Sequence, residues 1–369
     1  MKIIDVSAFE VIGRLTKPWK IATATMDALT AVVVRVTTDD GTVGYGEACT
    51  RKGAGVARAV VEEILRPVLV GREAGDIDAL WDEMVATLRT RGHTRGFLFE
   101  AISGVDIALW DIMGQVHEQP INKMLFGQGR THLPAYASSI LIDTPDRMAD
   151  EATLLVESDG YSAIKVKIAG DVAEDIARIS AIRSAIGRNV RIMLDANSGF
   201  DAADAAAFAR RAEPYDIYWL EEPLVLDDLP SYRRLRAMTG VRIALGEGEF
   251  HTSGFRTFLE EGLVDIVQPN ITRAGGFTGV RRIAALAQAF GVPIAPHTGA
   301  SGPVCMAATL QLGAALSGFA IHEFMYLENP FQDYFETPLP QPKDGAIAVP
   351  QGPGIGVRPA ANALGAFAA

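Results

Sequence analysis

The sequence has fewer cationic than anionic side chains. Its 369 residues include 34 Lys and Arg against 45 Asp and Glu, which gives a formal net charge of −11. A protein whose main partner is nucleic acid needs a cationic surplus to contact phosphates, so this balance excludes that class. Hydrophobic residues make up 49% of the chain and charged residues only 21%, which indicates a globular protein with a large buried core.

Cysteine is also scarce, with only Cys49 and Cys305, far apart in the chain. We expect both to be free thiols in a reducing compartment. The N-terminus does not have the unbroken apolar stretch of a signal peptide, because Asp5 and Glu10 interrupt it. We therefore expect a cytoplasmic protein.

One long stretch, residues 283–322, contains no Asp, Glu, Lys or Arg. A membrane-spanning helix requires ~20 consecutive apolar residues. Pro293, Pro296 and Pro303 interrupt this stretch, together with several glycines and His297. The pattern predicts a buried strand followed by a core helix, and no membrane partner.

The first ~130 residues predict strands followed by helices. Residues 29–36 alternate as a strand, Asp40-Gly41 is the turn, and TVGYGE is the returning strand. Helical patterns follow near residues 54–66, 76–89 and 97–115. This order indicates an α+β unit.

From about residue 133 short apolar runs alternate with helical segments. The candidate strands are LPAYASS, AIKVKI, VRIMLDAN, IYWLEEP, RIALGE, DIVQPN, PIAPHT and AIHEF. Polar residues close most of these runs at intervals of 23 to 28 residues, about the length of one βα unit. We expect a (β/α)8-type barrel with its active site at the carboxyl ends of the strands. The alternative is a doubly wound open sheet with ordinary polar loop residues.

Three carboxylates, Asp195, Glu221 and Glu247, end successive strands and converge in such a barrel. Three bare carboxylates side by side repel one another, and a divalent cation relieves that repulsion. All-oxygen ligands favour a hard ion, Mg²⁺ first, with Mn²⁺ as the alternative. The other interpretation is that each carboxylate caps a helix or pairs with an arginine.

Two lysines, Lys165 and Lys167, point to the same side of one strand. Close like charge and partial burial lower a lysine pKa, which makes an amine usable as a base. The alternative is an exposed strand edge with two solvated lysines. His297 ends the seventh run, in the register of the carboxylates, which favours a role in the site over a structural one.

The motifs AIKVKI, LDAN, WLEEP, GE, QPN followed by AGG, and PHTG, in this order and spacing, resemble the mandelate racemase subgroup of the enolase superfamily. The resemblance covers the whole chain. It implies an α/β fold, a modified TIM barrel (β/α)7β over residues 131–328, with an N-terminal α+β capping domain over 1–130. Residues 329–369, rich in proline, are expected to be a tail that packs on the capping domain. The resemblance also suggests a symmetric homo-oligomer.

The resemblance implies a role for each site position. Asp195, Glu221 and Glu247 would bind Mg²⁺, with Glu222 beside them. Lys167 would be the base on one face of the substrate, with Lys165 lowering its pKa and touching the substrate carboxylate. His297 would be the acid or base on the opposite face. Asn197 would hydrogen-bond the substrate, and Glu323 would orient the carboxylate, with Glu328 as a substitute.

Two positions depart from the family pattern. Asn270 stands where an aspartate usually bonds the histidine, so that His297 would act mainly as an acid, or the site would have lost activity. Arg273 stands where the lactonising and dipeptide-epimerising branches carry a lysine, and a guanidinium cannot act as a base. This argues against those branches.

The expected function is Mg²⁺-dependent removal of the proton α to a carboxylate through an ene-diolate, followed by loss of water from an acid sugar to give a 2-keto-3-deoxy acid. The substrate would be a small-molecule carboxylate. One alternative is a racemase or epimerase, which uses the same residues. The other is a barrel that binds a carboxylate ligand without catalysing, which Asn270 alone supports. Lys17, Lys20, Arg51 and Lys52 lie in loops that could contact the substrate or could be solvated.

Overall fold

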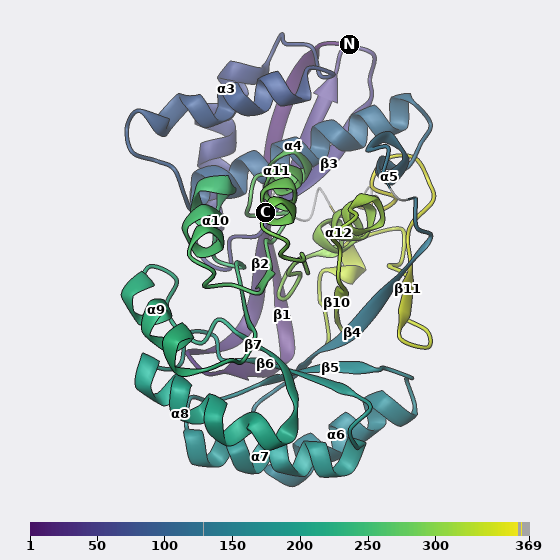
Figure 1. Cartoon of the computed structure of the whole chain (residues 1–369). Helices are drawn as coiled ribbons and strands as arrows, with labels where there is room; N and C mark the ends of the chain where they lie inside the picture. The colour runs from purple at the N-terminus through teal and green to yellow at the C-terminus, as the bar shows by residue number, and fades with distance from the viewer. Residues whose placement is uncertain (128, 361–362, 364–369) are drawn as a thin grey trace.

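The N-terminal unit is a three-stranded antiparallel sheet covered by helices (Figure 1). A computed structural model describes residues 1–127, 129–360 and 363. The strands are β1 (Ile3–Ile21), β2 (Ala24–Thr38) and β3 (Val43–Ala48). The helices are α1 (Ala54–Ala59), the π-helical η1 (Val60–Leu65), α2 (Arg66–Leu69), α3 (Ile77–Arg89), α4 (Phe97–Val116) and α5 (Ile121–Met124). The sequence predicted β2, β3 and the helical regions near residues 54–66, 76–89 and 97–115, but not the long β1 or the short α5.

Helix α4 is buried almost all round, because it lies between the sheet and the barrel helix α11 (Gly276–Ala289). Its approach to β3 is close enough to require glycine. A Cβ at Gly46 would overlap the carbonyl oxygen of Gly104 on α4. This contact fixes β3 against α4.

The second unit is a barrel of parallel strands (Figure 1). In the described part of the chain a helix follows each of the strands β4 to β9, and α12 follows a short bridge at Ile294. The strands are β4 (His132–Ile140), β5 (Ala163–Lys167), β6 (Arg191–Asp195), β7 (Ile217–Glu221), β8 (Ile243–Leu245), β9 (Ile266–Val267) and β10 (His322–Met325). The helices are α6 (Pro145–Glu157), α7 (Val172–Ile186), α8 (Ala202–Ala212) with the 3-10 turn η2 (Glu213–Tyr215), α9 (Leu229–Met238), α10 (His251–Glu260), α11 and α12 (Pro303–Ala315).

The barrel closes, which excludes the open doubly wound sheet. Strand β10 pairs parallel with β4, and Ile294 bridges β9 to Phe319 just before β10. The seventh predicted strand, PIAPHT, is therefore reduced to the bridge at Ile294. The arrangement is the expected (β/α)7β barrel beside an N-terminal α+β unit.

Inward-facing side chains, one from each strand or strand position around the barrel, fill its interior below the mouth. This inner cluster consists of Tyr136, Ala163, Met193, Trp219, Ala244, Ile266, Ala295 and Ile321. Along β5 the inward positions are Ala163, Lys165 and Lys167, because side chains alternate along a strand. The two lysines thus stand above the apolar layer, towards the carboxyl ends of the strands.

The segment after β10 runs back over both units. It contains the 3-10 turn η3 (Gln332–Tyr334) and strand β11 (Ala346–Ala348), which pairs with β4 of the barrel. Phe331 packs in the cluster around Trp19 of the N-terminal unit, and Ile355 N–H donates to Asp111 of α4. Part of the predicted tail, residues 361–362 and 364–369, lies outside the described residues. The limits of the predicted domains remain a prediction.

None of the described helices combines the length and the apolar character needed to cross a membrane.

Candidate active site

The strand register brings the predicted site residues side by side at the mouth of the barrel. Lys167 on β5 pairs with Asp195 on β6, and Asp195 pairs with Glu221 on β7. Glu247 follows β8 by two residues. All three carboxylates are buried, with at most 6% of each residue exposed. The spacing of polar residues in the sequence therefore corresponds to a spatial cluster.

Lys165 lies at the centre of this cluster and has no solvent exposure. Its Nζ is 2.7 Å from Glu221 Oε1, 2.6 Å from Glu323 Oε1 and 3.6 Å from Asp195 Oδ2. Burial alone would lower its pKa, but Glu221 and Glu323 together raise the pKa of Lys165 well above its ordinary value. Lys165 is thus held as an ammonium ion.

Lys167 stands one layer higher, is 8% exposed and pairs with Asp195 through its Nζ. It lines a cavity at the barrel mouth. The alternative of two solvated lysines on a strand edge is excluded, because both side chains are buried in a closed barrel.

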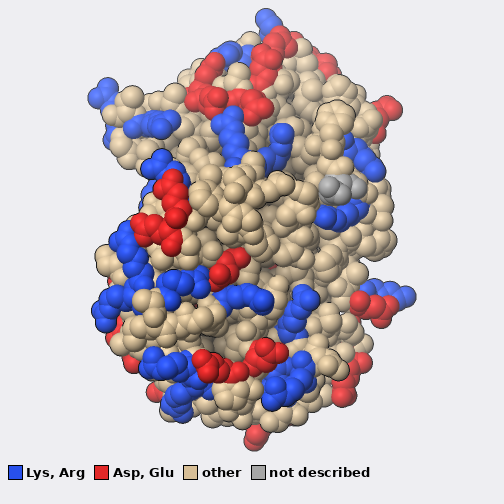
Figure 2. All heavy atoms as spheres, in the orientation of Figure 1, with Lys and Arg blue, Asp and Glu red and all other residues tan. Residues whose placement is uncertain are grey.

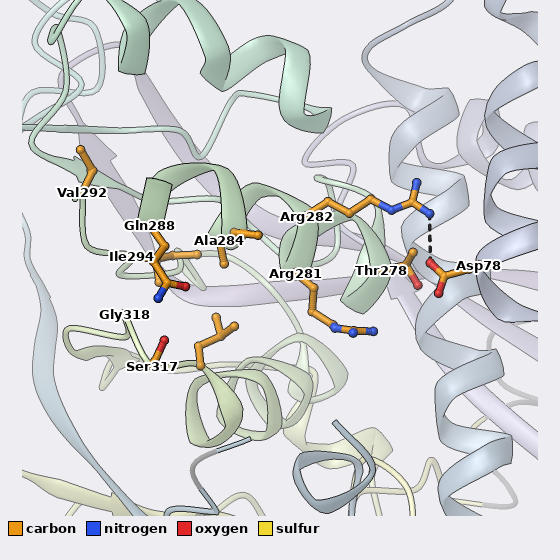
Figure 3. Close-up of a pocket in the computed structure, with 12 residues that line it drawn as sticks. Asp78, Thr278, Arg281, Arg282, Ala284, Gln288, Val292, Ile294, Ser317 and Gly318 are labelled. Atoms are coloured by element: carbon orange, nitrogen blue, oxygen red, sulfur yellow. Dashed lines mark hydrogen bonds and ion pairs between the residues drawn. The ribbon is translucent and has the colours of Figure 1, made fainter. Parts of the chain in front are cut away.

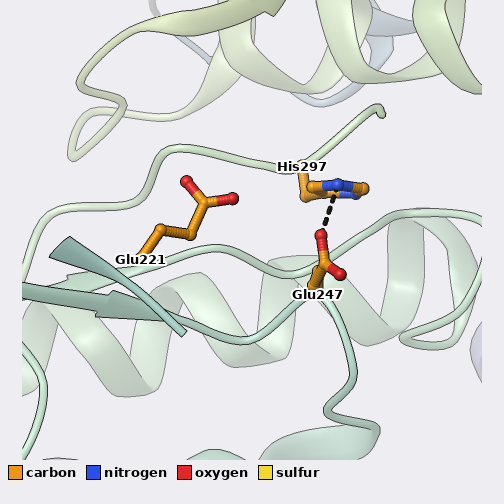
Figure 4. Close-up of side chains that lie close together, drawn as sticks. All are labelled: Glu221, Glu247 and His297. Carbon is orange, nitrogen blue, oxygen red and sulfur yellow. Dashed lines mark ion pairs between the residues drawn. The ribbon is translucent and has the colours of Figure 1, made fainter. Parts of the chain in front are cut away.

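Glu221, Glu247 and His297 form a group that could hold a metal ion (Figure 4). One ligand atom from each lies within 4.8 Å of the others. His297 Nε2 is 2.5 Å from Glu247 Oε2 and 3.9 Å from Glu323 Oε2. Arg51, from the loop after β3, reaches the same Glu247, with Nη1 3.0 Å from Oε1.

The carboxylates of the site hold more negative charge than their neighbours neutralise. Burial raises the pKa of Glu221 well above its usual value; Lys165 opposes this shift and Asp195 adds to it. Burial, followed by the charges of Glu247 and Asp195, raises the pKa of Glu222 to about 8.

The other two predicted ligands shift in the opposite direction. Burial would raise the pKa of Asp195, but Lys167 and Lys165 lower it. Burial would also raise the pKa of Glu247, but Arg51 and His297 lower it. The repulsion expected from the sequence is therefore seen at Glu221 and Glu222, where a divalent cation would relieve it.

Asn270 contacts His297, as its position predicted. The Asn270 Nδ2 is 3.2 Å from His297 Nδ1 and 3.2 Å from Ser301 Oγ. The Oδ1 accepts hydrogen bonds from Thr272 N–H at 2.9 Å and Thr272 Oγ1 at 2.6 Å. Every polar atom of the buried amide therefore has a partner.

The structure separates the two glutamates that the sequence left open. Glu323 is buried on β10, pairs with Lys165 and accepts hydrogen bonds from Ser138 Oγ and from Thr298 N–H. Glu328 accepts from Thr16 N–H of the N-terminal unit instead. Only Glu323 lies in the cluster.

A small cavity of about 40 Å³ lies above the cluster. Lys167, Asn197, Glu247, His297 and Glu323 line its floor, so it collects the predicted substrate-facing residues. The N-terminal unit supplies Trp19, Ile21, Met26 and Arg51 to its lining. Of the four loop cations considered from the sequence, only Arg51 lines this cavity.

Several residues of the site were not predicted from the sequence. Ser138 and Ser139 end β4 and line the cavity, and Gln268 Nε2 donates to Glu221 Oε2 at 2.7 Å. The two serines end the LPAYASS run, so the strand-end rule used for the other strands would have found them. Trp19 and Met26 carried no such signal, because they reach the site from the N-terminal unit.

A larger cavity of about 470 Å³ lies elsewhere, along α11 (Figure 3). Its charged lining residues are Asp78, Arg281 and Arg282, and Arg282 pairs with Asp78 of α3. None of the predicted site residues lines it. Of these two cavities, the predicted site residues therefore line only the smaller one.

Two family models match the chain. Residues 3–127 match the mandelate racemase / muconate lactonizing enzyme N-terminal domain. Residues 147–363 match the enolase C-terminal domain-like model.

Similar proteins match over most of their length. A D-galactarolactone cycloisomerase of Agrobacterium fabrum is 36% identical over 100% of this chain and 99% of the relative. An arabinonate dehydratase of Saccharolobus solfataricus is 34% identical over 88% of this chain and 87% of the relative. The crystal structure of the 3,6-anhydro-D-galactonate cycloisomerase from Zobellia galactanivorans superimposes with a TM-score of 0.89, at 33% identity, over 100% of this chain and 99% of that one.

Proposed function

The chain belongs to the mandelate racemase / muconate lactonizing enzyme family of the enolase superfamily, and on that premise we propose that it is a sugar-acid dehydratase. It would remove the proton α to the substrate carboxylate and then eliminate the β-hydroxyl, which takes up the proton carried by Lys167 and leaves as water. The enol that remains would ketonise to a 2-keto-3-deoxy acid. The observation that carries this proposal is the cavity, which Lys167 and His297 both line beside the carboxylate cluster.

The residues present fit a divalent cation. Asp195, Glu221 and Glu247 offer buried carboxylate oxygens, the ligands that Mg²⁺ prefers, and Mn²⁺ accepts them too. Glu247 Oε2 lies 2.5 Å from His297 Nε2, and Glu247 Oε1 lies 3.0 Å from Arg51 Nη1. We assign these three carboxylates as the metal ligands. Bound there, Mg²⁺ would stabilise the second negative charge that develops on the substrate carboxylate.

The remaining residues have roles that follow from their charges and positions. Lys165, held as an ammonium ion between Glu221 and Glu323, is fully buried and is not among the residues that line the cavity, so it supplies a fixed positive charge beneath the site rather than the expected contact with the substrate carboxylate. Lys167 is the base that accepts the α-proton. Asn197 has an unpartnered Oδ1 at the cavity and can accept a hydrogen bond from a substrate hydroxyl. Glu323 fixes Lys165 and the loop at Thr298.

Cycloisomerisation is a second candidate, favoured by the match of a cycloisomerase to the full length of this chain. The same proton removal and β-elimination would occur. When the departing β-oxygen belongs to a ring of the substrate, it stays in the molecule, so the ring opens and the product is an isomer. The two candidates differ in the substrate and share the site.

Product analysis distinguishes these candidates. The purified protein with Mg²⁺ is incubated with a panel of linear sugar acids, their lactones and their anhydro forms, and the products are measured by mass and proton NMR. A product lighter by one water, with a new methylene signal, supports the dehydratase. A ring-opened product of unchanged mass supports the cycloisomerase. Epimers without elimination would replace both with a racemase or epimerase, and binding without reaction would indicate a carboxylate-binding barrel.

We also place the protein in the cytoplasm as a homo-oligomer. Both cysteines are free and buried, which supports a reducing compartment. Light scattering of the purified chain tests the second point: a single species of one subunit mass would contradict it.

A further inference from the structure

Asn270 determines which nitrogen of His297 carries the proton. The surrounding hydrogen-bond donors fix the orientation of the Asn270 amide. Thr272 N–H is a backbone donor and lies 2.9 Å from one terminal atom of Asn270, so that atom must be the acceptor Oδ1. The flipped amide would place two donors against each other in a site with no solvent exposure.

With Oδ1 fixed, the amide nitrogen faces the imidazole. The two hydrogens of Nδ2 have two acceptors available, His297 Nδ1 and Ser301 Oγ, each at 3.2 Å. An amide NH₂ can only donate. His297 Nδ1 must therefore be the unprotonated nitrogen, with its lone pair towards Asn270.

A ring whose Nδ1 is unprotonated carries its proton on Nε2. That nitrogen faces Glu247, with Nε2 2.5 Å from Oε2 (Figure 4). It lies 3.9 Å from Glu323 Oε2. The other ring orientation would place carbon atoms against both the amide and the carboxylate.

We infer that Asn270 holds His297 as the neutral Nε2–H tautomer, so that the site has one base, Lys167. An aspartate at this position would accept a hydrogen bond from Nδ1–H and leave Nε2 with a free lone pair. Asparagine donates a hydrogen bond to Nδ1 instead, so that Nδ1 is the acceptor and Nε2 carries the proton. His297 then offers a hydrogen bond to a substrate oxygen and cannot take a proton from carbon. Asn270 is thus a positioning residue.

The tautomer of His297 follows from its contacts alone, whereas its consequence for catalysis rests on the proposed function. When the α C–H bond breaks, the proton goes to the lone pair of Lys167 Nζ and the electron pair goes into the ene-diolate. Racemisation requires a second base on the opposite face, and a ring that already carries its proton at Nε2 does not supply one. The site would therefore remove the α-proton of only one C2 epimer and would not interconvert epimers.

The tautomer is measured first, on the purified full-length chain without substrate. Long-range ¹H–¹⁵N NMR of ¹⁵N-histidine-labelled protein at pH 8 distinguishes protonated from bare ring nitrogens, and the spectrum of His297→Gln identifies the His297 signals by difference. We expect a bare Nδ1 and a protonated Nε2. A proton on Nδ1 in the wild-type protein would overturn the inference, and this result alone decides the matter if variants fail to fold.

Two variants test the cause. Asn270→Asp should move the proton to Nδ1, because the new carboxylate accepts it. Ser301→Ala is the matched control, since it removes the second acceptor of the same amide without touching the ring, and it should leave the proton on Nε2. An unchanged tautomer in Asn270→Asp, or a changed one in Ser301→Ala, would show that another contact sets it.

The catalytic consequence is measured separately, as exchange of the α-proton in D₂O for each C2 epimer of a substrate. The wild-type protein should exchange one epimer, and Asn270→Asp should raise exchange of the other by ~100-fold, the contribution of a general base. Equal exchange of both epimers by the wild-type protein would overturn the one-base site. No exchange of either epimer, with the expected tautomer present, would instead contradict the proposed function.

Discussion

At the scale of single residues, the site depends on Lys165, a charged side chain without solvent exposure. Its Nζ contacts Glu221 and Glu323 directly, and Asp195 lies within 3.6 Å. A buried charge is costly unless it is paired, so the lysine and the carboxylates stabilise one another only as a set. This explains why the lysine remains charged at the centre of a protein core.

We predict that Lys165→Met destabilises the Mg²⁺-free protein by about 3–5 kcal/mol, because buried carboxylates lose their partner. The measurement is the urea unfolding midpoint of each variant in EDTA. Lys52→Met, at an exposed position in the loop after β3, is the control and should leave the midpoint unchanged. A loss below about 1 kcal/mol for Lys165→Met would mean that the carboxylates do not depend on this lysine.

At the scale of elements, helix α4 joins the two units through buried acids. Glu100 pairs with Arg273 at 3.0 Å, and Asp106 Oδ2 accepts a hydrogen bond from Thr278 N–H in the first turn of α11 at 3.1 Å. A helix N-terminus favours a carboxylate, but complete burial dominates and raises the pKa of Asp106 to about 7. Its Oδ1 has no hydrogen-bond partner.

The pKa of Asp106 makes stability depend on pH in a defined direction. The folded pKa of Asp106, about 7, exceeds the unfolded value of about 3.9. The stabilisation of the folded state by protonated Asp106 is therefore complete below pH 4 and is lost as the pH rises through 7. From pH 5.5 to 8 the wild-type protein should lose about 2 kcal/mol through this group. Asp106→Asn keeps the acceptor for Thr278 and removes the titration.

We therefore expect the stability of Asp106→Asn relative to wild type to increase by about 2 kcal/mol between pH 5.5 and pH 8. Urea unfolding of both proteins at the two pH values measures this difference. Asp78→Asn, an exposed aspartate of α3, is the control and should show little change. A constant difference between Asp106→Asn and wild type would show that Asp106 does not titrate in this range.

At the scale of the whole molecule, the barrel supplies the charged floor of the cavity and the N-terminal unit supplies part of its wall. Arg51 reaches Glu247, and Thr16 N–H donates to Glu328 after β10. The net charge of −11 is not gathered in one patch on the face seen in Figure 2, where cationic and anionic side chains are interspersed. The concentrated negative charge described above is instead buried in the site.

We predict that Mg²⁺ stabilises the whole protein, because it binds the folded site and not the unfolded chain. At a concentration of about 100 times its Kd, it should add about 2.7 kcal/mol, seen as a higher unfolding temperature. Glu221→Gln and Glu247→Gln should remove this shift, while Glu260→Gln, at an exposed position of α10, should keep it. An equal shift in all three variants would place the ion elsewhere.

The sequence predicted the barrel and its site where apolar runs that end in a polar residue repeat along the chain. Asp195, Glu221 and His297 could be found because a polar residue closes each apolar run at a regular interval, and the closed sheet turns that interval into proximity. Strand β1 was missed because its residues mix apolar and charged side chains without a long apolar run.

Other parts of the site depend on contacts that no linear pattern contains. Arg51 meets Glu247 across 196 residues of sequence, so its place in the cavity required the packing of the two units. The orientation of the Asn270 amide depends on the backbone N–H of Thr272. The sequence showed that asparagine replaces the usual aspartate, but only the three-dimensional contacts show which way its donor points.

The most direct test of the account is exchange of the α-proton with solvent deuterium, measured by proton NMR with Mg²⁺ and the sugar acid that the panel identifies. We predict exchange or elimination by the wild-type protein and a ~10²–10⁴-fold loss in Lys167→Met, with the Mg²⁺-dependent stabilisation retained. If Lys167→Met removes the α-proton as fast as the wild-type protein, then Lys167 is not the base and the central claim is wrong.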